Sequence, residues 1–137
     1  MTMSKKLPLA LLCFCLLGPT AARAQTICPA DDPRIRALPD RYLTRDNFAD
    51  HRAQVGLAGV STSQLRALTD ATDAAICNRI AALVGTPPAN WRWAAYQVGN
   101  LYFVAFWHFQ TDGGQRLGFA PLYIMDRKLK QVGGFAM

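Results

Sequence analysis

The sequence contains no glutamate, so its nine acidic residues are all aspartates, against 15 lysines and arginines. Charged residues make up only 18% of the chain and hydrophobic residues 51%, a balance that excludes an intrinsically disordered protein. It also lacks a glycine repeat, a heptad pattern and any apolar run of about 18 residues, which excludes a collagen-like fibre, a coiled coil and a membrane-spanning helix. A length of 137 residues is typical of one globular domain.

Residues 1–24 are typical of a secretory signal peptide. Lys5 and Lys6 precede an apolar stretch at residues 7–17, and Ala22-Arg23-Ala24 forms a small-residue cleavage site. As a helix the apolar stretch would be about 16 Å long, half the thickness of a bilayer core, and therefore too short for an anchor. We expect an exported protein of the bacterial periplasm or the extracellular medium, with no membrane span after the leader is removed.

Residues 25–137 are then expected to form a single domain. Loss of Lys5, Lys6 and Arg23 with the leader lowers the formal net charge from +6 to +3. A charge this small in an exported chain argues against a nucleic-acid partner. Arg127, Lys128 and Lys130 form a basic cluster that suits either an acidic partner or a solvated turn.

Two cysteines, Cys28 and Cys77, remain outside the leader. In an exported domain such a pair most simply forms one disulfide. Closing a loop of about 50 residues stabilises a fold by on the order of 4 kcal/mol in the chain-entropy model. A metal site would need more cysteines or histidines nearby, and a redox pair would need the Cys-x-x-Cys spacing, so neither is expected.

The pattern predicts an α+β fold of one main helix on a four-stranded antiparallel meander. The N-terminal segment, residues 25–60, is expected to be irregular apart from a short helix over Arg34–Leu38, and residues 64–69 to form a short strand or a helical turn. Asp70 and Asp73 cap a helix that ends at Gly85. The four strands are expected at residues 91–98, 101–110, 116–125 and 131–137. A helix followed by a meander resembles the cystatin-like and PepSY-like architectures in outline, which implies the fold and no site residue.

Eleven of the 14 aromatic residues lie between Trp91 and Phe135. A turn at Gly99-Asn100 places Arg92 opposite Trp107 on one face of the sheet, and gives the other face an apolar character as well. Three explanations remain open: helix 70–84 and residues 25–60 each cover one face, a homodimer buries one face, or one face binds a partner or ligand. The candidate binding residues are Trp91, Trp93, Tyr102, Phe106, Trp107 and His108.

The sequence favours a small non-enzymatic binding protein that recognises another protein, in an inhibitor or immunity-type role. It has no G-x-S-x-G nucleophile motif, and its two histidines, His51 and His108, are too far apart in sequence to suggest a metal or cofactor site. His51, between Asp50 and Arg52, is expected to be a solvated surface group. The alternative is a small-molecule pocket or a simple acid/base enzyme around His108, because a histidine among aromatic residues can titrate near neutral pH.

Overall fold

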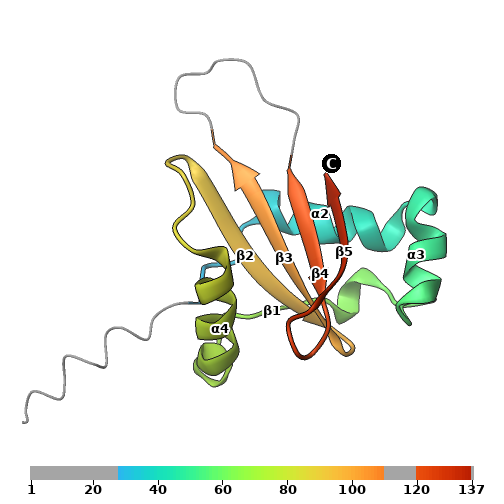
Figure 1. The fold of residues 1–137 in the computed structure, drawn as a ribbon. Helices are drawn as coiled ribbons and strands as arrows, with labels where there is room; N and C mark the ends of the chain where they lie inside the picture. Colours follow the sequence, from blue (N-terminus) through green and yellow to red (C-terminus); the bar gives the residue numbers. More distant parts are fainter. Residues whose placement is uncertain (1–27, 110–119, 137) are drawn as a thin grey trace, which may run out of the picture.

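The computed structural model describes residues 28–109 and 120–136, so the signal peptide assigned to residues 1–24 lies outside the described residues. The fold is α+β, as predicted, and its helices and strands are shown in Figure 1. They are α2 (Pro33–Thr44), α3 (Ala49–Gln54), β1 (Arg66–Ala67), α4 (Ala74–Val84), β2 (Trp91–Val98), β3 (Leu101–His108), β4 (Pro121–Met125) and β5 (Gln131–Ala136), with short 3-10 turns at Asp46–Phe48, Thr62–Gln64 and Ala71–Asp73.

The strands form one antiparallel sheet in the order β1-β2-β3-β4-β5. Strands β2 to β5 are the expected meander, and the two-residue β1 adds a fifth strand at the edge. The β2–β3 register is the predicted one, with Val98 opposite Leu101 and Arg92 opposite Trp107. Gly99 supplies the positive φ of 56° that begins the tight turn between these strands.

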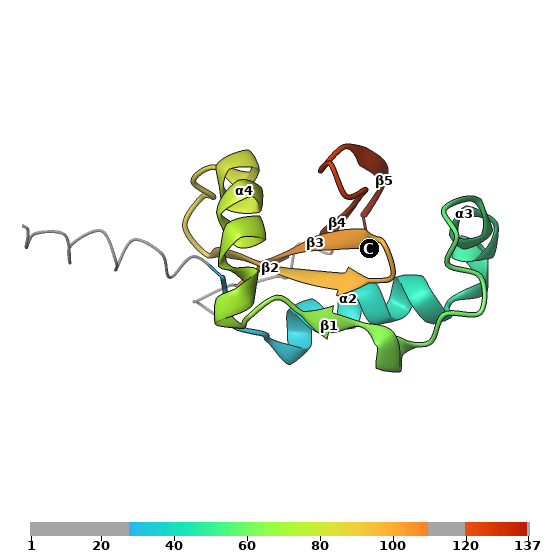
Figure 2. The ribbon, with the colours of Figure 1, turned by 90° about the horizontal axis from the view of Figure 1, so that it is seen from below.

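The two faces of the sheet are covered unequally. Helix α2 lies across one face, whereas α4 lies on the other face toward β2, and β5 curls toward the same side as α4 (Figure 2). The larger core cluster lies between α2 and the sheet and includes Leu38, Tyr42, Tyr96 and Phe103. The smaller cluster lies between α4 and the sheet and contains Leu68, Cys77, Ile80, Ala95 and Val104.

Helix α2 is longer than predicted, because it continues through Pro39 to Thr44. Asp32 caps its start by accepting a hydrogen bond from the Arg34 amide at 2.8 Å. Proline inside a helix costs about 3 kcal/mol because it removes one hydrogen bond and crowds the preceding turn. Here the Pro39 ring is buried in the core together with Leu38 and Tyr42, and this burial offsets the penalty. The expectation of an irregular segment was therefore wrong for most of residues 33–54.

Helix α4 ends as predicted, but it begins at Ala74, four residues after Asp70, because the 3-10 turn Ala71–Asp73 comes first. The carboxylates of Asp70 and Asp73 form a capping box around that 3-10 turn, which leads directly into α4, and Gly85 ends the helix with a φ of 72°. The expected disulfide joins Cys28 to Cys77 with a Cα–Cα distance of 5.2 Å, so it ties the segment before α2 to the buried side of α4.

Candidate binding site

Helix α2 and the larger core cluster cover one face of the sheet. Tyr96 and Phe103 are fully buried on this face. Trp107 is half-buried and packs against the same cluster. Of the six candidate residues, Trp107 therefore lies apart from the other five, on the opposite face of the sheet.

The α4 face is only partly covered. Trp91, Trp93, Tyr102, Phe106 and His108 alternate onto this face, and all five are half-buried. Trp93, Tyr102 and Phe106 pack around the smaller core cluster. An antiparallel sheet with one face in water normally alternates apolar with polar residues, so these half-buried aromatic side chains make the α4 face a candidate binding surface.

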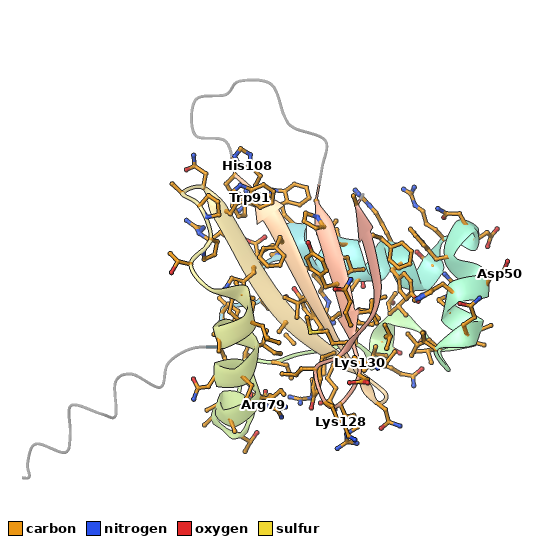
Figure 3. All side chains as sticks on the ribbon, in the orientation of Figure 1. Asp50, Arg79, Trp91, His108, Lys128 and Lys130 are labelled. Carbon is orange, nitrogen blue, oxygen red and sulfur yellow. A yellow bond between two sulfur atoms is a disulfide. The ribbon has the colours of Figure 1, made fainter. Side chains whose placement is uncertain are left out.

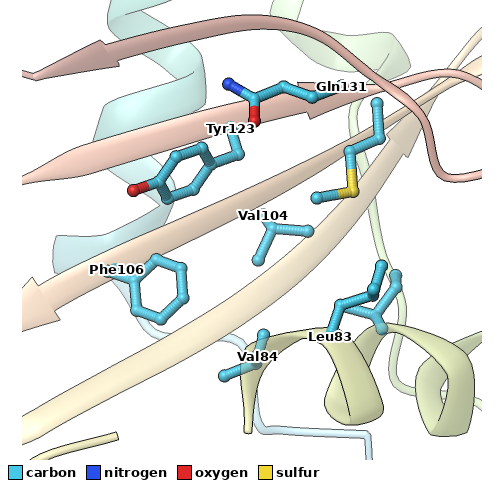
Figure 4. A pocket seen from close by; sticks show the side chains of 8 residues that line it. Leu83, Val84, Val104, Phe106, Tyr123 and Gln131 are labelled. Carbon is cyan, nitrogen blue, oxygen red and sulfur yellow. The ribbon is translucent and has the colours of Figure 1, made fainter.

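Two adjoining hollows lie on this face between α4 and strands β4 and β5. The first has a volume of about 290 Å³ and is lined by Ile80, Leu83, Val84, Val104, Phe106, Tyr123, Met125 and Gln131 (Figure 4). The second has a volume of about 330 Å³ and is lined by Val84, Thr86, Pro87, Pro88, Trp91, Phe106, Pro121 and Tyr123. Val84, Phe106 and Tyr123 line both hollows, which therefore lie side by side, and we call the two together the trough.

Leu83 forms part of the wall of the trough and is 58% exposed. Its position in α4 follows from helical spacing, because Ile76, Ile80 and Leu83 recur on one side of the helix. Two polar groups lie among the apolar lining, the Tyr123 hydroxyl and the Gln131 side-chain amide (Figure 4). Neither makes a side-chain hydrogen bond within residues 28–109 and 120–136.

The shape of the trough depends on strand β5. A register shift between Ile124 and Met125 interrupts the β4–β5 pairing. Such bulges bend and twist a strand locally. Strand β5 thus rises beside β4 on the same side as α4 (Figure 2).

His108 lies at the end of β3 and pairs with Trp91 across the sheet. The two rings are 5.1 Å apart between centroids. Its Nδ1 is buried and has no hydrogen-bond partner among the described residues. Trp91 and Phe106 line the trough, whereas His108 is not part of its lining.

His51 is not a solvated surface group, contrary to expectation. Its Nε2 lies 3.1 Å from the Val132 carbonyl oxygen of β5, which only accepts hydrogen bonds, so Nε2 carries the proton. In the neutral ring Nδ1 then accepts from the Tyr42 hydroxyl at 2.6 Å. Burial raises the pKa of Tyr42 to about 12, with nearby Arg52 acting in the opposite direction. His51 is therefore a structural link between α2, α3 and β5.

Of the six residues proposed from the sequence, Trp91 and Phe106 line the trough, whereas Trp93, Tyr102, Trp107 and His108 do not. The other lining residues were not among the candidates. Leu83 and Val84 had the spacing of ordinary core residues, and Tyr123 and Gln131 belonged to strands with no distinguishing motif. The part of the chain that the structure describes holds no group of three His, Cys, Asp or Glu side chains able to bind a metal ion, and no helix there is long and apolar enough to cross a membrane. No protein-family model, curated protein or solved structure matches this chain.

Proposed function

We propose that this protein is an exported, non-enzymatic binding protein that seats an apolar segment of a partner protein in the trough, in an inhibitor or immunity-type role. The observation that carries the proposal is the exposure of Leu83 beside two apolar hollows. In the described residues only Leu83 and Val132 are large, exposed hydrophobic side chains. An exposed leucine that continues into an aromatic-lined depression is typical of a protein interface.

The polar groups of the trough favour a peptide over a purely apolar ligand. Burying the Tyr123 hydroxyl and the Gln131 amide under a hydrocarbon would leave both without hydrogen bonds, at about 1–3 kcal/mol each. A peptide backbone brings its own donors and acceptors to such groups. Trp91, Phe106 and Tyr123 also belong to the rigid aromatic class that dominates protein interfaces.

A small-molecule or acid/base site around His108 is the second candidate, favoured by its buried Nδ1. A general acid or base must lie within hydrogen-bond reach of the proton that it transfers, and His108 lines neither hollow of the trough. The ring that lies against His108 within the described residues is that of Trp91, which does not titrate. His108→Gln is therefore expected to leave partner binding in the trough intact, whereas loss of binding would favour this second candidate.

Site-specific photo-crosslinking tests the proposal in the protein's own cells. A benzoyl-phenylalanine at position 83 is expected to crosslink one partner protein. The same group at position 54, on the exposed end of α3, serves as the control. Crosslinks at position 83 to a second copy of this chain alone, or the same products from both positions, would contradict the proposal.

The purified partner then allows a quantitative test. Leu83→Asp places a charge on an already exposed position and is expected to weaken the dissociation constant by about 30-fold or more, as for a central interface residue. Gln54→Asp is the matched control and should bind like the wild type. Unchanged binding by Leu83→Asp would exclude the trough as the docking site.

A further inference from the structure

We infer that the partner segment carries acidic residues beside its apolar ones, and that its carboxylates pair with Arg79, Lys128 and Lys130 at one end of the trough. This inference rests on the proposed function and specifies the chemistry of the occupant. We call these three side chains the basic rim.

The basic rim lies next to the first hollow on both sides. Arg79 is four residues before Leu83 in α4, so the two side chains share one side of the helix, one turn apart. Lys128 and Lys130 belong to the turn that joins Met125 to Gln131, two residues that line the hollow. Figure 3 shows Arg79, Lys128 and Lys130 gathered at the same end of the molecule, away from Trp91 and His108.

The charges of the basic rim are not compensated within the described residues. The ion pairs found there join Arg34 to Asp32, Arg36 to Asp31 and Arg66 to Asp73. None of these pairs involves Arg79, Lys128 or Lys130.

The one carboxylate in the same turn is that of Asp126, which is used to hold the turn. Its Oδ1 accepts hydrogen bonds from the backbone amides of Lys128 and Lys130, both at 2.9 Å. These hydrogen bonds hold the pKa of Asp126 below its usual range. The side-chain ammonium groups of Lys128 and Lys130 thus remain available to an acidic partner, and complementary charge would steer its approach.

An anionic membrane surface is the competing occupant for an apolar depression with a basic rim. Acyl chains would cover the Tyr123 hydroxyl and the Gln131 amide without pairing them, which is unfavourable. An acidic, amphipathic peptide satisfies the apolar lining, the two polar groups and the basic rim together.

A phage-displayed library of random dodecapeptides supplies the probe. Selection on the immobilised wild-type protein is expected to enrich peptides in which Asp or Glu lies next to Leu, Phe or Trp. The best peptide is then synthesised and its dissociation constant is measured for the wild type and for Lys128→Glu/Lys130→Glu. We expect at least a tenfold weakening by this variant, and a loss of affinity as salt rises from 50 to 500 mM.

Arg45→Glu/Arg92→Glu is the control for charge, because it changes the net charge equally at exposed positions away from the trough and breaks none of the ion pairs found in the described residues. Enrichment of basic or uncharged peptides, or equal affinity of the peptide for the wild type and the Lys128/Lys130 variant, would overturn this inference. The trough would still be supported as the docking site if Leu83→Asp abolished binding of the same peptides. Peptides that bind Leu83→Asp as well as wild type would overturn the proposed function as well. Binding of phosphatidylglycerol vesicles without any peptide enrichment would replace the peptide with a membrane surface.

Discussion

Gly133→Ala is expected to destabilise the protein through a residue 82 positions away in the chain. A Cβ at Gly133 would lie 2.6 Å from Cε1 and 2.8 Å from Nε2 of His51, closer than van der Waals contact allows. The backbone of Gly133 does not have the left-handed φ that only glycine tolerates, so the clash alone determines the effect. The His51 ring must move away from β5.

The size of the effect follows from the hydrogen bonds that this movement breaks. His51 bonds to the Tyr42 hydroxyl and to the Val132 carbonyl. Each contributes about 1 kcal/mol net, so Gly133→Ala should lower the free energy of unfolding by about 2 kcal/mol. In a domain of this size that corresponds to a fall in Tm of about 8 °C, measurable by calorimetry or by circular dichroism with urea.

Gly134→Ala is the matched control, because its Cβ would meet the flexible end of the Gln131 side chain at 2.7 Å, and that end can move aside. It should be close to neutral, since alanine also reduces the entropy of the unfolded chain. In a His51→Ala background, Gly133→Ala should cost almost nothing, which gives a coupling energy of about 2 kcal/mol. Equal effects of the two glycine substitutions, or an undiminished effect of Gly133→Ala without His51, would refute the reasoning.

Two further predictions concern α4 and its surroundings. The double variant Cys28→Ser/Cys77→Ser should be less stable than the wild type by on the order of 4 kcal/mol, and reductant should not change its unfolding midpoint. A wild-type unfolding midpoint that is the same with and without reductant would contradict the disulfide. Hydrogen bonds from Arg66 hold the pKa of Asp73 below its usual range. The ionised Asp73 carboxylate therefore stabilises the fold fully above about pH 4, which is the pKa of an aspartate in the unfolded chain. This stabilisation is lost as the pH falls through the lower pKa of Asp73 in the folded protein. When the free energy of unfolding is measured from pH 2 to 7, Asp73→Asn should lose less stability at acidic pH than the wild type. Identical pH profiles would exclude a stabilising role for the Asp73 carboxylate.

Local signals made the β2–β3 hairpin and α4 predictable from the sequence. A glycine-first turn fixes the pairing of Val98 with Leu101, and the alternation of side chains then fixes every other pair. The capped turn at Asp70 that leads into α4 and the end of the helix at Gly85 depend on residues within a few positions. The disulfide was predictable for another reason, since only two cysteines lie outside the predicted signal peptide.

Features that depend on distant residues were not predictable in this way. Pro39 normally ends a helix, and only its burial against the sheet explains why α2 continues. His51 lies among charged neighbours in sequence, yet its partners include Val132, 81 positions away. In both cases tertiary packing overrides a local preference, and no pattern within a short window reveals it.

The trough also depends on distant residues and could not be predicted from local patterns. Apolar residues on both faces of the sheet would fit equally well with two faces that are fully covered by other parts of the chain. Helix α2 does cover one face, which removes Trp107 from the candidate site. Among the helices in the described part of the chain, α4 alone packs on the other face of the five-stranded sheet and leaves part of that face uncovered. Strand β5, which follows the register shift between Ile124 and Met125, borders the uncovered part. The hollow beside Leu83 is lined by residues of α4, β3, β4 and β5 together, so the surface on which the proposed function rests arises from the packing of distant segments and from no single motif.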